Sequence, residues 1–182
     1  VATKMLIYIG LAMAWNVVGG IGGQLSLGHS VFIGLGALLP AAMFLKLSVP
    51  LWIGVLCAAA VSAAIGAAIS WITFRFRLGH LYFALVTLTI GELGRIVVIG
   101  TEFLGGASGL LVQYKPWSVG AISISVAMQN LMFALGFAAI AVLTTWAILR
   151  SKLGFYLRAL KGNEDAAQAI GINLLRSKMI AM

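Results

Sequence analysis

The stretch 51–74, LWIGVLCAAAVSAAIGAAISWITF, contains no charged residue and ends at Arg75. A helix that crosses the hydrocarbon core of a bilayer needs about 20 predominantly apolar residues. The whole chain has 62% hydrophobic residues, 9% charged residues and a mean hydropathy of +1.10, whereas a soluble domain typically carries about 25% charged residues. The stretch therefore predicts a membrane-spanning helix within an integral membrane protein.

Further apolar runs lie on both sides of this stretch. They cover 5–18, 29–46, 81–100 and 130–149. Together these runs predict an all-α fold, a polytopic transmembrane helix bundle that forms one domain over residues 1–182. Residues 101–120, rich in glycine, are expected to form a loop. The alternation of apolar residues with serine in 121–129 is compatible with a short strand or with an interfacial helix.

Positive charge predicts which side of the membrane each loop occupies. Six of the twelve Lys and Arg residues fall in 150–178, and Arg75 and Arg77 bring two more into 75–80. Lys and Arg near the ends of spans stay on the cytoplasmic side, so 150–178 and 75–80 are expected to be cytoplasmic. The net charge of +8 is thus interpreted as a topology signal, and no nucleic-acid partner is expected.

A glycine-rich segment, 19–28 (GGIGGQLSLG), interrupts the first two apolar runs. Each glycine costs a helix about 1 kcal/mol relative to alanine, and irregular backbone at membrane depth must be buried in protein or line a watery cavity. The segment is either a pathway-lining break in a helix or a simple turn. The possible substrate-pathway residues here are Gln24, Ser26, Gly28 and His29.

Glu92 and Arg95 are charged residues inside the apolar run 81–100. Charges within a span are expensive and usually face a cavity or a partner. Residues three apart share one face of a helix, so an ion pair that fixes packing is an equally simple explanation. Both residues are therefore candidates for the substrate pathway, with a structural ion pair as the alternative.

The segment 150–178 has the pattern of short helices. Asn163 is a good N-cap, and Glu164 and Asp165 would then lie in the first turn, where the helix dipole favours acids. The small residues Ala166 and Ala167 suit close approach to a groove on another protein. The alternative is a basic amphipathic helix that lies on anionic lipid.

Four blocks of the chain, in order, resemble the permease subunits of branched-chain amino acid ABC transporters. They are 23–37 (GQLSLGHSVFIGLGA), 79–95 (GHLYFALVTLTIGELGR), 101–110 (TEFLGGASGL) and 153–173 (LGFYLRALKGNEDAAQAIGIN). The chain resembles the LivM-like branch of that family more than the LivH-like branch. The likeness also suggests that the chain is a piece of a longer permease that lacks spans at both ends.

The last block resembles the EAA loop, through which an ATPase subunit grips the membrane subunit. This resemblance implies that the ATPase-coupling residues are Glu164, Asp165, Ala166, Ala167 and Gly171. It further implies ABC ATPase subunits, a homologous second permease subunit and a periplasmic or extracytoplasmic solute-binding protein as partners, in addition to the lipid bilayer.

The function implied by the resemblance is the permease subunit of an ATP-driven importer in a bacterial inner membrane. Its substrates would be branched-chain amino acids (leucine, isoleucine and valine) or a related small polar solute. The alternative is a secondary transporter or channel with no ATPase partner. The sequence contains no nucleotide-binding motif, metal-ligand cluster or nucleophile–base arrangement, so no catalytic residue, metal or cofactor is expected and ATP hydrolysis is expected in a separate subunit.

Overall fold

The computed structural model describes residues 1–76, 79–112, 117–119 and 122–182. Eight α-helices are found in this part of the chain: α1 (Ala2–Asn16), α2 (His29–Leu47), α3 (Leu51–Arg75), α4 (His80–Gly100), α5 (Val126–Arg150), α6 (Lys152–Gly162), α7 (Glu164–Ala169) and α8 (Leu174–Ala181). A π-helical turn, Val17–Ile21, continues α1. Strands β1 (Trp117–Val119) and β2 (Ile122–Ile124) form one short antiparallel hairpin.

Within the described residues, five helical segments are long and apolar enough to cross a membrane. They are Ala2–Ile21, His29–Leu47, Leu51–Arg75, Leu81–Gly100 and Val126–Arg150. These segments match the five apolar runs of the sequence, and the expected class of an all-α polytopic bundle is confirmed.

The first span is longer than the run 5–18 suggested. Gly19 and Gly20 do not end the helix, because they lie in the π-helical turn that carries it to Ile21. A backbone inside a membrane must satisfy its own hydrogen bonds, and this requirement outweighs the low helix propensity of glycine. The prediction that 5–18 needs preceding residues to complete a span is therefore wrong, since Ala2–Ile21 has the required length.

The connection between α4 and α5 is only partly loop. Two 3-10 turns, Glu102–Leu104 and Gly106–Ser108, follow α4. Of the two structures considered for 121–129, a strand is present at its start, while α5 already begins at Val126. The parts of these predictions that concern 113–116 and 120–121 lie outside the described residues.

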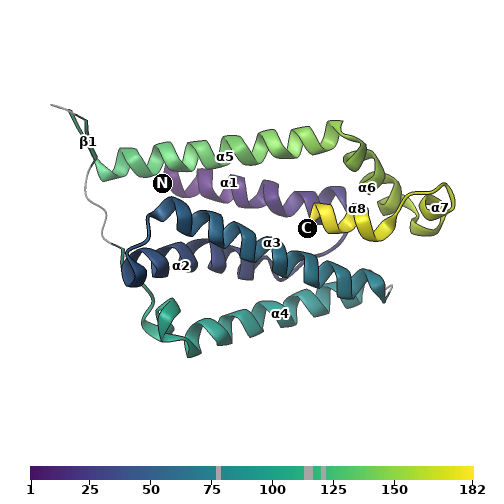
Figure 1. Ribbon diagram of the computed structural model, residues 1–182. Coiled ribbons are helices and arrows are strands. Elements are labelled where there is room, and N and C mark those ends of the chain that lie inside the picture. The colour runs from purple at the N-terminus through teal and green to yellow at the C-terminus, as the bar shows by residue number, and fades with distance from the viewer. Residues whose placement is uncertain (77–78, 113–116, 120–121) are drawn as a thin grey trace.

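The spans lie alongside one another, and the short helices gather at one end of the bundle (Figure 1). Helices α1 and α5 lie side by side and run in the same direction, whereas α2 and α3 form an antiparallel pair. The helices α6, α7 and α8 lie at the end where α3 finishes and α4 begins (Figure 1). The expected orientation requires 150–178 to share one end with 75–80, and the described residues of both segments do so; residues 77 and 78 lie outside the description.

Apolar packing at this end joins the short helices to the spans. Leu157 of α6 is fully buried against Val17 and Ile21 of the π-helical turn. Phe74 of α3 stacks on Phe83 of α4, with 5.6 Å between the ring centroids. The short helices are therefore part of the folded bundle, because their apolar faces are covered by the ends of the spans.

Candidate functional site

The glycine-rich segment leaves helical geometry after Ile21 and regains it at His29. Two contacts hold it in place: the indole Nε1–H of Trp15 donates to the Ser26 carbonyl at 2.8 Å, and the Leu27 N–H donates to Oγ1 of Thr87 at 3.1 Å. Thr87 lies seven residues into α4, roughly 10 Å along a helix that rises 1.5 Å per residue. Non-helical backbone thus enters the depth of the span, where protein covers it as the absence of water requires.

Gly28 is the tightest point of this contact. A Cβ atom at Gly28 would lie 2.2 Å from the carbonyl oxygen of Thr87. Such a distance is far inside van der Waals contact, so a side chain here would have to push α4 away from the segment. Glycine is therefore required at position 28 by the close approach of two backbones.

The polar candidates of the segment face protein. Gln24 is 4% exposed and Ser26 is 2% exposed. The Ser26 hydroxyl and His29 Nδ1 share a hydrogen bond of 2.9 Å, and which of the two donates depends on the tautomer of the histidine. These side chains brace the segment from within. A direct role of Gln24, Ser26, Gly28 and His29 in a substrate pathway stays a prediction.

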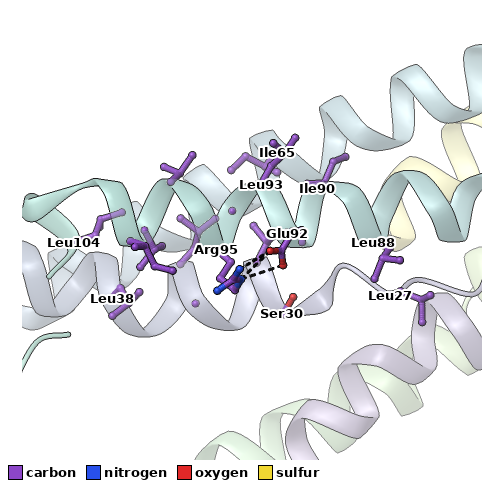
Figure 2. Close-up of a pocket in the computed structure, with 18 residues that line it drawn as sticks. Leu27, Ser30, Leu38, Ile65, Leu88, Ile90, Glu92, Leu93, Arg95 and Leu104 are labelled. Carbon is purple, nitrogen blue, oxygen red and sulfur yellow. Dashed lines mark hydrogen bonds and ion pairs between the residues drawn. The ribbon is translucent and has the colours of Figure 1, made fainter. Parts of the chain in front are cut away.

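A cavity of about 600 Å³ lies between α2 and α4 (Figure 2). Its lining is mostly aliphatic, with leucine, isoleucine and valine from both helices, and it includes Ser30 of α2 and the pair Glu92 and Arg95 of α4. In the described part of the chain, the segment 22–28 contributes Leu27 to this wall. The cavity thus combines an apolar surface with one pair of opposite charges.

Glu92 and Arg95 are bonded to each other. Arg95 Nη2 lies 2.6 Å from Glu92 Oε1, and Arg95 Nε donates to both carboxylate oxygens at 3.0 and 3.1 Å. The side chains are 56% and 63% exposed respectively, and Figure 2 shows both charged groups at the cavity. The ion pair proposed as the structural alternative is present, and it also lines the cavity. Because open lipid is a costly environment for such a pair, this face of α4 requires cavity water or another protein against it.

The boundaries predicted for the short helix α7 are confirmed. The side-chain oxygen of Asn163 accepts from the Ala166 N–H at 3.0 Å and caps the helix. At the other end, Gly171 has φ of +90°, its N–H bonds to the Gln168 carbonyl, and the Ile172 N–H bonds to the Ala167 carbonyl. This pattern is a Schellman motif, in which glycine at C′ satisfies the last carbonyls of a helix.

The five predicted coupling residues do not form one face. Asp165, Ala166 and Gly171 are exposed, whereas Ala167 is 3% exposed and packs against Leu160 and Ile172. A partner on the outside of α7 therefore does not reach the Ala167 methyl group, and a large residue there would disturb this chain itself. At Gly171 a Cβ would meet no atom within 4 Å, so a bulky substitution there acts through the positive φ and not through a clash.

Glu164 is held toward the bundle. Lys178 Nζ lies 2.5 Å from Glu164 Oε1 and 5.0 Å from the centroid of the Phe74 ring. The Lys178 side chain is only 4% exposed. An ammonium group so thoroughly removed from water needs a charged or aromatic partner, and here it has both.

Sequence reasoning overlooked three residues of this region. Lys178 was counted only as a cytoplasmic charge, because lysine is rarely buried. Thr87 was passed over inside an apolar run, although a hydroxyl in a span is a signal for a contact between helices. Ile170, 75% exposed beside Ala166, could have been found as an apolar residue at the end of a capped, otherwise polar helix.

The fold and the two sites define a multi-pass membrane protein with charge-dense short helices at one end. Over residues 1–182 the sequence matches the family described as "Branched-chain amino acid transport system / permease component". The chain belongs to this family of permease subunits and is a protein of the inner membrane.

Two curated relatives carry the description "High-affinity branched-chain amino acid transport system permease protein LivM". The one from Salmonella typhimurium is 30% identical, and the one from Escherichia coli K12 is 28% identical, each over 204 aligned positions. Both alignments include all of this chain and 48% of the relative, so the chain spans about half the length of these proteins. No solved structure matches the chain.

Proposed function

We propose that the protein is the membrane-spanning subunit of an ATP-driven importer for branched-chain amino acids or a related small polar solute. The observation that carries the proposal is the Glu92–Arg95 ion pair on the wall of an aliphatic cavity, within a chain of the branched-chain amino acid permease family. A branched-chain amino acid is a zwitterion with an aliphatic side chain. The cavity offers chemistry of both kinds.

The ion pair would act by exchanging partners. Its members neutralise each other when the cavity is empty, which lowers the cost of charges at mid-span. A substrate carboxylate could bond to the Arg95 guanidinium in a bidentate manner, and the ammonium group could bond to Glu92. The aliphatic lining would accept the side chain, with the apolar area removed from water providing part of the affinity.

The proposed partners occupy opposite ends of the molecule. ATPase subunits would dock on the exposed residues of α7, Asp165, Ala166 and Ile170, with Gly171 ending that helix. A solute-binding protein would deliver substrate at the end that carries the β1–β2 hairpin. A homologous second permease would cover the exposed face of α4, and ATP would be hydrolysed by the ATPase subunits.

Transport by the intact complex tests this proposal. Full-length protein purified from native membranes with its bound subunits is reconstituted into vesicles, and uptake of radiolabelled leucine is measured with and without ATP and binding protein. We expect uptake to require both. A homomer that transports without ATP would instead support the alternative of a secondary transporter or channel.

The role of the ion pair is tested with substitutions in the same complex. We expect Glu92→Gln and Arg95→Gln to reduce leucine uptake about tenfold or more, the loss that corresponds to one charge-assisted bond. Thr89→Val is the matched control, because Thr89 is an exposed polar residue of α4 that bonds to the Leu85 carbonyl. Normal uptake in both charge variants would assign Glu92 and Arg95 to packing alone.

A further inference from the structure

Lys161 links α6 to the end of the first span. Its Nζ donates to the carbonyl oxygen of Gly20 at 2.8 Å, a contact between residues 141 positions apart. Gly20 lies in the π-helical turn just before the chain leaves helical geometry. The carbonyls at such an end lack partners within the helix, and a lysine is well suited to bind one of them.

The aliphatic stem of the same lysine packs against Gly23. Gly23 has φ of +68°, and a Cβ atom there would lie 2.5 Å from Lys161 Cγ and 3.1 Å from Lys161 Cβ. The stem therefore lies directly on the Gly23 backbone. A single side chain thus contacts the glycine-rich segment twice, through a hydrogen bond at Gly20 and through packing at Gly23.

Lys161 lies between the two candidate sites. It is in the last turn of α6, and Asn163, which caps α7, is two residues further along the chain. In the other direction the segment that it holds continues to Leu27, whose N–H is bonded to Thr87 of α4. Figure 1 shows α6, α7 and the C-terminal end of α1 together at one end of the bundle.

Packing makes α6 a suitable element to transmit displacement. Leu160 packs against Ala167 of α7, and Leu157 packs against Val17 and Ile21 of the π-helical turn. Close-packed interiors have low compressibility, so elements joined in this way move together or not at all. A displacement of α7 therefore reaches α6, and Lys161 is the polar side chain by which α6 holds the segment.

We infer that Lys161 is a positioning residue that ties the movement of α7 to the segment Gly20–Gly23, and through it to the backbone that enters the membrane beside α4. This inference rests on the proposed function, in which ATPase subunits move α7. The simpler interpretation is that Lys161 only stabilises the end of α1. The two differ in whether ATP hydrolysis continues without transport when the contact is lost.

The first measurement is the number of ATP molecules hydrolysed per leucine imported by the reconstituted complex. We expect Lys161→Met to retain the bound ATPase subunits and their hydrolysis but to raise this ratio about tenfold, equivalent to about 1.4 kcal/mol. Lys161→Arg, which keeps a stem and a donor, should restore most of the coupling. Lys152→Met, at an exposed lysine in the first turn of the same helix, is the control.

A disulfide gives a second test that does not depend on comparing different proteins. Because the ideal Cβ of Gly23 lies 3.1 Å from the Cβ of Lys161, close to the usual separation in a disulfide, the pair Gly23→Cys and Lys161→Cys should form a bond in a Cys57→Ser background. We expect the reduced form to be uncoupled and the oxidised form to regain at least half of the normal coupling. Both forms carry the same substitutions, so backbone strain at Gly23 cancels.

The outcomes separate this inference from the proposed function. If wild-type complex imports leucine with ATP and Lys161→Met does so equally well, the positioning role is wrong while the proposed function stands. If Lys161→Met does not assemble, the disulfide pair decides: equal coupling in the oxidised and reduced forms overturns the inference. Wild-type uptake that needs no ATP would count against the proposed function itself.

Discussion

Gly28 illustrates how one residue sets the distance between two backbones. Replacing Gly28 with alanine would place a methyl group 2.2 Å from the Thr87 carbonyl oxygen. We expect Gly28→Ala to lower the free energy of unfolding by about 1–3 kcal/mol, the usual cost of overpacking, measured by thermal unfolding of the full-length protein in detergent. Gly36→Ala is the control, since a Cβ there would meet no atom within 4 Å. Equal loss in both variants would contradict the explanation.

Lys178 is a second residue whose environment yields a prediction. We expect Lys178→Met to lower the free energy of unfolding by about 1.5–3 kcal/mol, because it removes a bond between charged groups from a poorly hydrated site. Arg176→Met, on the exposed side of α8, should change stability by less than about 0.5 kcal/mol. A double-mutant cycle with Glu164→Gln checks the cause, and additive effects would rule out the pair as the source of the loss.

At the scale of elements, α7 presents one alanine outward and buries its neighbour. We expect Ala166→Trp to leave thermal stability unchanged but to reduce the amount of ATPase subunit that co-purifies, since Ala166 is exposed at the proposed contact. Ala167→Trp should instead destabilise the fold by about 1–3 kcal/mol, because Ala167 packs on Leu160 and Ile172. Retention of the ATPase by Ala166→Trp would show that docking occurs elsewhere.

At the scale of the whole molecule, charge and fold predict one orientation in the membrane. A membrane-impermeant maleimide applied to spheroplasts should modify a cysteine at Ala107, which is exposed in the turn after α4. A cysteine at Lys152 should react only after lysis, because α6 lies at the end expected to be cytoplasmic. Both substitutions are made with Cys57→Ser and with any other cysteine removed. The opposite labelling pattern would invert the topology.

Most of the fold could be predicted from composition and local pattern. The uncharged stretch at 51–74 is sufficient for a spanning helix, because only internally hydrogen-bonded elements cross a bilayer. The caps Asn163 and Gly171 mark the ends of α7 for the same kind of local reason. What local pattern could not give was the continuation of α1 through Gly19 and Gly20, since the membrane environment overrides intrinsic propensity there.

The sequence by itself therefore determined the class of fold, the number of spans in this part of the chain, the family and the ends of α7. Tertiary structure alone decided that Ala167 faces inward, that Glu92 and Arg95 share a cavity with α2, and that Lys161 and Lys178 hold distant segments. The physical reason is distance along the chain. Caps and apolar runs act between near neighbours, whereas the Lys161 bond to Gly20 joins residues 141 positions apart and exists only once the helices are packed.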